Sequence, residues 1–175
     1  MTAVLLLAAG ACSDSSAPES TSTPELETAP AGAREALGAG DAAPDFHGAL
    51  LGGGDVDLPA LEGRPFVLNF WLTTCEPCIR EMPALALVMD DNDDLVVVGV
   101  NFGESPDHIN AFLDAFEVDI DFPILLDPDG DVTFGYEVVA LPTSYFVDSG
   151  GIIRYRRVGE LFDEHIAVGV ERITQ

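Results

Sequence analysis

The chain has 175 residues, enough for one domain and a tail, and its hydrophobic fraction of 47% is too high for a disordered protein. Its formal net charge is −24 at pH 7, and it contains arginine but no lysine. Because such a surface repels polyanions, we expect neither nucleic acid nor anionic lipid headgroups as partners.

The first forty residues indicate an export signal followed by a tether. Val4–Ala11 is a short apolar run, too short to span a bilayer but suited to the core of a signal peptide. Its end, Ala-Gly-Ala before Cys12, resembles a bacterial lipoprotein cleavage site, which implies that Cys12 becomes a lipidated N-terminus. The alternatives are a plain cleaved signal or a frayed apolar end. We therefore expect a signal peptide over residues 1–11 and a flexible acidic tether over 12–40, rich in Ser, Thr, Ala, Pro and Glu.

The pattern changes at Asp41, which predicts a folded domain over residues 41–175. Short alternating segments around three consecutive glycines predict a small N-terminal hairpin between Phe46 and Leu58. The apolar run 66–71 predicts a buried central strand, and a helix is expected from Cys75 to about Asp90. Within that helix, Pro83 predicts a kink rather than an end.

The second half of the domain continues the alternation of strands and helices. We expect a buried strand over 95–102, a helix over 104–117, a short apolar segment over 122–126, a short helix over 132–136, paired strands over 143–148 and 152–158, and a final helix from Leu161. This order predicts an α/β domain with a central mixed β-sheet flanked by helices.

The cysteine pair Cys75-Glu76-Pro77-Cys78 carries the chemistry that the sequence predicts. A metal site needs about four ligands, and the chain has neither a second such pair nor histidines at ligand spacing, so we expect no metal. The pair follows a strand and opens a helix, where the helix dipole and free backbone N–H groups stabilise a thiolate. This setting predicts reversible disulfide chemistry, in which Cys75 attacks and Cys78 resolves the mixed disulfide.

Three segments carry a resemblance to a known family. The run Asn69–Pro83 (NFWLTTCEPCIREMP) closely resembles the active-site segment of the TlpA/ResA-like thioredoxin family. The run Leu141–Asp148, with the glycines that follow, resembles that family's cis-proline loop and strand, and Phe122–Gly130 also fits. The resemblance extends from about Gly40 to the C-terminus. It implies a thioredoxin-like fold and a thiol–disulfide oxidoreductase that needs no cofactor.

The resemblance also implies roles for individual residues. Cys75 and Cys78 correspond to the nucleophilic and the buried cysteine. Pro142 corresponds to the cis-proline that faces the disulfide and, with Leu141, helps to hold a substrate chain. Glu81 matches a glutamate near the cysteines; one turn beyond Cys78 on the same side of the helix, its carboxylate is placed to accept or relay the proton of that thiol and to raise its pKa.

Glu76 and Pro77, between the cysteines, are further expected contacts for substrate. The chain departs from the family at several positions. Thr74 stands where many members have tryptophan, which removes an aromatic lid, and Ala140 stands where many have glycine. Asn69 replaces the buried aspartate of cytoplasmic thioredoxins, which leaves Glu81 as the nearer candidate for proton transfer.

These observations predict a monomeric, membrane-tethered, extracytoplasmic dithiol reductant. Its clients would be exported proteins such as apocytochrome c, and its electrons would come from a membrane thiol donor of the CcdA/DsbD type. Two alternatives stay open: an oxidase that introduces disulfides, and a non-catalytic binding lipoprotein on the same scaffold. A peroxidase of the peroxiredoxin type is disfavoured, because it needs threonine where Leu72 stands and proline where Leu68 stands.

Overall fold

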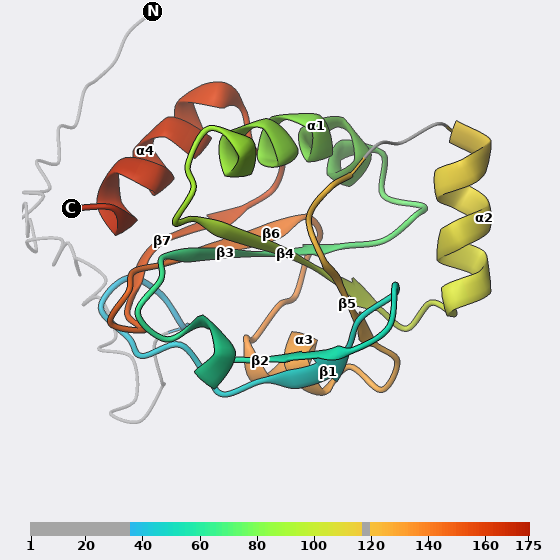
Figure 1. The fold of residues 1–175 in the computed structure, drawn as a ribbon, viewed down its shortest axis with the longest axis horizontal. Coiled ribbons are helices and arrows are strands. Elements are labelled where there is room, and N and C mark those ends of the chain that lie inside the picture. The colour runs from blue at the N-terminus through green and yellow to red at the C-terminus, as the bar shows by residue number, and fades with distance from the viewer. Residues whose placement is uncertain (1–35, 117–119) are drawn as a thin grey trace, which may run out of the picture. The chain divides into compact units, whose positions relative to one another are not determined.

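The computed structural model describes residues 36–116 and 120–175 (Figure 1). Contacts between Cα atoms divide the chain into the units Met1–Arg34 and Glu35–Gln175. The second unit is an α/β domain, as the alternation of strands and helices predicted. The expected signal peptide, Cys12 and the expected tether up to residue 35 lie outside the described residues, and they stay predictions.

The domain is built on a five-stranded mixed sheet with the strand order β5-β4-β3-β6-β7. Strands β3, β4 and β5 are parallel to one another, whereas β6 and β7 are antiparallel to their neighbours. A separate antiparallel pair, β1-β2, is the hairpin expected near the N-terminus. The strands are β1 (His47–Ala49), β2 (Asp55–Asp57), β3 (Phe66–Trp71), β4 (Val96–Phe102), β5 (Ile124–Asp127), β6 (Thr143–Val147) and β7 (Ile153–Val158).

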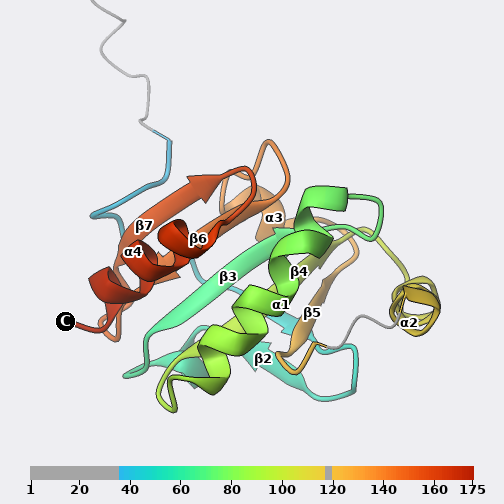
Figure 2. The ribbon, with the colours of Figure 1, turned by 90° about the horizontal axis from the view of Figure 1, so that it is seen from above.

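Helices cover both faces of the sheet (Figure 2). They are α1 (Glu76–Asp90), α2 (Pro106–Phe116), α3 (Asp131–Gly135) and α4 (Asp163–Ile173), with the 3-10 turn η1 at Pro59–Leu61. Helices α1 and α4 lie side by side on one face, α3 and the β1-β2 pair lie on the other, and α2 lies beyond the β5 edge (Figures 1 and 2). Each face therefore has its own apolar core.

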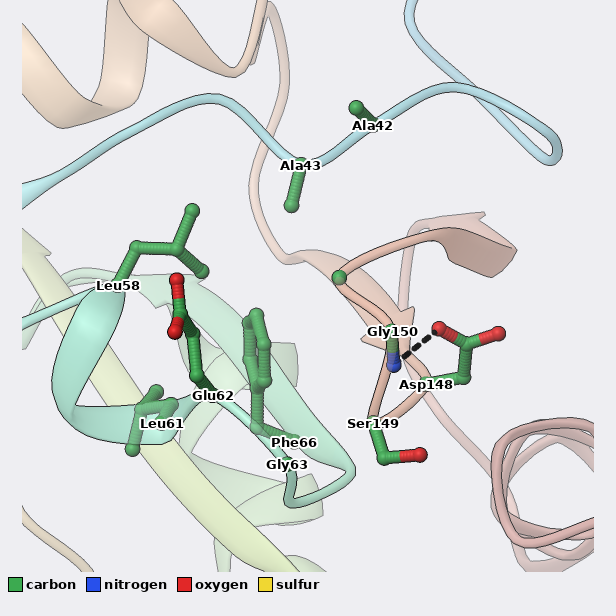
Figure 3. A pocket seen from close by; sticks show the side chains of 11 residues that line it. Ala42, Ala43, Leu58, Leu61, Glu62, Gly63, Phe66, Asp148, Ser149 and Gly150 are labelled. Atoms are coloured by element: carbon green, nitrogen blue, oxygen red, sulfur yellow. Dashed lines mark hydrogen bonds between the residues drawn. The ribbon is translucent and has the colours of Figure 1, made fainter.

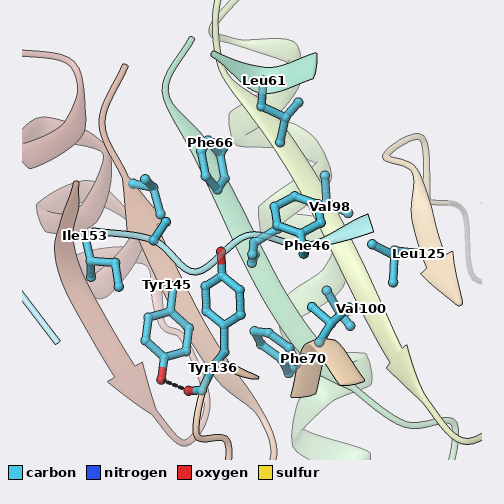
Figure 4. Packing of buried hydrophobic residues seen from close by; sticks show 14 of the residues in the cluster. Phe46, Leu61, Phe66, Phe70, Val98, Val100, Leu125, Tyr136, Tyr145 and Ile153 are labelled. Atoms are coloured by element: carbon cyan, nitrogen blue, oxygen red, sulfur yellow. Dashed lines mark hydrogen bonds between the residues drawn. The ribbon is translucent and has the colours of Figure 1, made fainter. Parts of the chain in front are cut away.

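The core under α3 and β1 is rich in aromatic side chains (Figure 4). Phe46, Phe70, Tyr136 and Tyr145 meet edge-on or tilted, with ring centroids 5.2–6.4 Å apart. The hydroxyl of Tyr145 donates to the backbone carbonyl of Tyr136 at 2.5 Å, which gives the buried phenol a partner. The core under α1 and α4 includes Trp71, whose side chain is fully buried.

The helix that follows β3 covers the residues expected for it. It begins at Glu76 with Cys75 as its N-cap, and it continues through Pro83 to Asp90. Proline has no N–H to donate, but α1 is held by burial of Met82 and Leu85 against the sheet, so it does not end there.

The packed domain begins upstream of the boundary expected at residue 41. Leu37 is 4% exposed, and its backbone N–H donates to Glu137 at 3.0 Å. Gly40 donates to the carbonyl of Ile153 at 2.8 Å. Residues 37–40 are therefore part of the domain and not of a tether. Their own composition carries no periodicity, and only tertiary partners far along the chain reveal the contact.

Candidate active site

Cys75 and Cys78 form a disulfide at the start of α1, directly after the loop that leaves β3. Their Cα atoms lie 5.2 Å apart. The two sulfurs differ in environment, because Cys78 is fully buried in the core under α1 while Cys75, at the N-cap, is only half-buried. Because Cys75 is the less buried of the two and lies at the helix N-terminus, it is the cysteine that a second molecule can reach, and the free N–H groups of the first turn favour its thiolate.

The loop before Cys75 is held by a carboxylate that sequence reasoning missed. Glu104, just after β4, accepts hydrogen bonds from the backbone N–H of Thr73 at 2.9 Å and from its hydroxyl at 2.6 Å. Asn101 donates to the same carboxylate at 2.7 Å, and His108 Nε2 lies 3.0 Å from the Thr73 hydroxyl. The side chain of Glu104 is 13% exposed. Glu104 therefore fixes the backbone two residues before the half-exposed cysteine.

A sequence signal for this contact exists in retrospect. Asn101 is a polar residue inside an otherwise apolar strand, and Glu104 follows where that strand ends. Strands β3 and β4 are parallel neighbours, so their carboxyl ends meet at the edge where the cysteines lie.

Glu81 is almost fully buried beneath the disulfide helix, at 2% exposed. Its carboxylate accepts the backbone N–H of Leu161 and the Asn69 side-chain amide, each at 2.6 Å. Burial raises the pKa of Glu81 from 4.5 to about 7; the two hydrogen bonds and the positive charge of Arg157 act in the opposite direction, and the nearby Glu160 adds to the rise. The carboxyl group therefore changes its protonation near neutral pH.

Glu81 also lines a surface pocket of about 530 Å³ between α1 and the start of α4. Arg80 crosses this region, with two hydrogen bonds to Glu160 at 2.9 and 2.7 Å and one to Glu76 at 2.9 Å. These contacts tie the loop after β7 to the first turn of α1. The pocket therefore lies next to the residue that carries the buried carboxyl group.

The Leu141–Pro142 peptide bond is cis, as the family resemblance implied. Pro142 is buried and Leu141 half-buried, and the next residue, Thr143, pairs with Phe70 near the end of β3. The carbonyl of Pro142 accepts the N–H of Gly159 at 2.8 Å. The cis-proline loop is therefore at the sheet end from which the chain leads to the disulfide.

The remaining expected contacts, Glu76 and Pro77, lie in the first turn of α1. The side chain of Glu76 is 87% exposed, and Pro77 is half-exposed. The structure therefore brings Cys75, Cys78 and Glu81 together on one helix and places the cis-proline loop at the same end of the sheet. Cys12 lies outside the described residues.

A pocket of about 400 Å³ lies elsewhere and has no connection with the disulfide (Figure 3). Leu58, Glu62 and Phe66 line it from one side, and Asp148 and the glycines after β6 from the other. Phe66 begins β3, whereas the disulfide follows its far end, so the length of the strand, about 17 Å, separates the two. The described residues contain no group of three or more His, Cys, Asp or Glu side chains that could hold a metal ion. They also contain no helix that is long and apolar enough to cross a membrane.

Comparisons with known proteins agree with this geometry. A family model described as the AhpC/TSA family matches residues 39–156. The thioredoxin-like protein YneN of Bacillus subtilis is 39% identical over 126 residues, 70% of this chain and 72% of the relative. The thiol-disulfide oxidoreductase ResA of Geobacillus thermodenitrificans is 32% identical over 142 residues, 80% of each chain. A secreted Mycobacterium tuberculosis disulfide oxidoreductase has a similar structure, with a TM-score of 0.62 and 25% identity over 72% of this chain and 94% of the other.

Proposed function

We propose that this protein reduces disulfides in exported proteins. The proposal starts from its family: the chain belongs to the AhpC/TSA family and, within it, to the TlpA/ResA-like thiol–disulfide oxidoreductases of thioredoxin fold. The observation that carries the exchange chemistry of this proposal is the asymmetry of the disulfide: a half-buried Cys75 at the helix N-terminus and a fully buried Cys78. An attacking thiol needs access and a low pKa, and a resolving thiol needs protection from outside reagents.

The reaction proceeds by two exchanges. The Cys75 thiolate attacks one sulfur of a client disulfide, which forms a mixed disulfide and releases one client thiolate. Cys78 then gives up its proton and attacks the Cys75 sulfur, which forms the Cys75–Cys78 bond and releases the second client thiolate. Two electrons pass from the protein to the client, and the client thiolates take up two protons. A dithiol donor restores the reduced protein.

Glu81 is proposed to move the proton of Cys78. Positions 78 and 81 are one turn apart on the same face of α1, so their side chains are neighbours. A carboxyl group whose pKa is about 7 accepts a proton at neutral pH and releases it again with little cost. Glu81 also lines the pocket near Arg80 and Glu160, which is the proposed route of the proton to solvent.

Client contacts are proposed for Leu141 and Pro142 in the cis-proline loop and for Glu76 and Pro77 in the first turn of α1. Glu76 and Pro77 directly follow Cys75, and the cis-proline loop lies at the sheet end from which the chain leads to Cys75, so a client chain bound across both segments would present its disulfide to Cys75. Thr74 offers no aromatic surface there, which favours clients that are held by backbone hydrogen bonds more than by side-chain stacking.

The finer biological setting is also a proposal. Residues 1–11 would act as signal peptide, Cys12 would carry lipid, and the residues after it would tether the domain outside the cytoplasmic membrane. Apocytochrome c is the proposed client, and a membrane protein of the CcdA/DsbD type is the proposed dithiol donor. The similarity to ResA proteins and to a secreted oxidoreductase supports an extracytoplasmic location.

An insulin-reduction assay tests the dithiol mechanism. The wild type should catalyse turbidity in the presence of dithiothreitol, and Cys75→Ser should abolish catalysis. Cys12→Ser is the matched control, because it removes a cysteine that takes no part in the exchange, and it should retain full activity. Equal, negligible activity in the wild type and in Cys75→Ser would refute the proposal. Trapping with Cys78→Ser, which cannot resolve the mixed disulfide, should then identify the client covalently bound to Cys75.

A further inference from the structure

A chain of buried polar groups connects Glu81 to the centre of the sheet. Asn69 on β3 lies opposite Ser144 on β6, and its side-chain nitrogen Nδ2 donates to Ser144 Oγ at 2.9 Å and to Glu81 Oε1 at 2.6 Å. The exposed fractions of Asn69, Ser144 and Glu81 are 0%, 1% and 2%. Both hydrogens of the amide are therefore committed to acceptors in the interior, where water does not compete with them.

The other end of the same amide is unused. Asn69 Oδ1 is buried and has no hydrogen-bond partner in the part of the chain that the structure describes. A buried acceptor left without a donor costs about 1–3 kcal/mol, so such atoms usually have a role. Here the idle oxygen belongs to the side chain that touches the carboxyl group whose protonation must change.

The present arrangement suits an ionised Glu81. One of its oxygens accepts the N–H of Leu161 and the other accepts Asn69, so a carboxylate is well satisfied. A protonated Glu81 carries an O–H that needs an acceptor, and the Asn69 nitrogen offers hydrogens instead. Turning the amide by 180° about its last side-chain bond exchanges the nitrogen and the oxygen at nearly constant volume.

We propose that Asn69 is a positioning residue whose side-chain amide turns over each time Glu81 gains or loses a proton. In the turned state, Oδ1 accepts from the Glu81 O–H and from the Ser144 hydroxyl, which donates instead of accepting, and the two hydrogens of Nδ2 move to the place that Oδ1 has in the structure. Asn69 thus keeps Glu81 in one place in both protonation states. The inference rests on the proposed role of Glu81 as the group that exchanges a proton with Cys78.

The charged groups around Glu81 do not take over the role proposed for the Asn69 amide. Glu160 and Arg157 face Glu81 from the β7–α4 side and act on its pKa in opposite directions, and Arg80 neutralises Glu160 through their paired contact. Cys78 is the titratable neighbour on α1 itself, and it carries no proton while it is in the disulfide. The hydrogen bond between Asn69 and Glu81 is therefore the interaction that must reverse its direction, with Asn69 accepting instead of donating, when Glu81 becomes protonated.

Nuclear magnetic resonance of the oxidised protein tests the proposal without relying on catalysis. The side-chain N–H₂ resonances of Asn69 are followed with pH, together with the carboxyl carbon of Glu81. The two should titrate with the same midpoint. In Glu81→Gln, the glutamine oxygen faces Leu161 and its nitrogen faces Asn69, so the Asn69 resonances should be independent of pH and match those of the wild type at low pH.

Asn69 resonances in Glu81→Gln that match the wild type at high pH would overturn the proposal. Asn69→Leu provides a second test through the pKa of Glu81. If Asn69 serves both protonation states, the leucine variant removes one hydrogen bond from each, and the pKa should move by less than about one unit. An upward shift of about 1–2 units would show that Asn69 serves the carboxylate alone. Failure of insulin reduction with these results intact would refute the proposed function and leave the amide turn standing.

Discussion

Replacing Glu81 with glutamine should change how the stability of the oxidised protein depends on pH. In the folded state burial holds the pKa of Glu81 at about 7, whereas the unfolded chain has the ordinary value of 4.5. The unfolded state therefore loses its proton first as the pH rises. The contribution of Glu81 is most favourable below the lower pKa, falls as the pH rises between the two values, and is constant above the higher one.

The size of the effect follows from the two pKa values. A shift from 4.5 to about 7 corresponds to about 3.4 kcal/mol when it is complete, at about 1.36 kcal/mol per unit. Between about pH 5 and about pH 8.5, roughly 2.5 kcal/mol of this should be lost. Glu81 is 2% exposed, so screening by solvent does not reduce it much.

Urea denaturation measures the free energy of unfolding of wild type and Glu81→Gln without reductant, both in a Cys12→Ser background. Subtracting one curve from the other removes the contributions of the other acidic residues. The glutamine variant should gain about 2.5 kcal/mol relative to the wild type between the two pH values. A relative gain of less than about 1 kcal/mol would refute the reasoning that burial controls this carboxyl group.

Three further outcomes follow from the packing. In the reduced protein, iodoacetamide should alkylate Cys75 at least about tenfold faster than Cys78, measured by mass mapping of the peptide that contains both. Glu104→Gln should lower the free energy of unfolding by about 2 kcal/mol, measured by urea denaturation, because an amide cannot accept all the hydrogen bonds that the carboxylate receives. Gly169→Ala should lower it by about 1–3 kcal/mol, although alanine favours a helix, because the added methyl group would overlap the buried ring of Phe146.

The opposite result of each experiment would contradict one of these structural assignments. Equal alkylation rates would contradict the assignment of attacking and resolving thiols. An unchanged stability of Glu104→Gln would mean that the loop before Cys75 is held by other contacts. A stabilised Gly169→Ala would mean that α4 packs farther from the sheet than the structure places it.

The sequence predicted those features that follow from a local pattern of residues or from a motif shared with a known family. Apolar runs with turn residues at their ends predicted β3 and β4, and the helix expected from Cys75 to about Asp90 is present from Glu76. The cis bond before Pro142 was expected from the family resemblance and is present. The roles of the individual site residues stay proposals that the experiments above test.

The sequence did not reveal contacts between side chains that are far apart along the chain. Thr73 and Glu104 are 31 positions apart, and Glu81 reaches the backbone of Leu161 across 80. Neither contact follows from periodicity, because each depends on the sheet register and on which loops meet at one edge. The packing of Leu37 on the domain was missed for the same reason, since one leucine in a polar segment predicts nothing by itself.

The reduction potential of the Cys75–Cys78 pair decides whether this pair donates electrons to clients or takes electrons from them. Equilibration of the purified protein with defined dithiothreitol buffers, followed by quantification of the free thiols, gives the potential at pH 7. A protein that reduces client disulfides should have a value near that of thioredoxin, about −270 mV. A value near about −120 mV, that of a strong oxidant, would contradict the proposed function and assign the protein to disulfide formation.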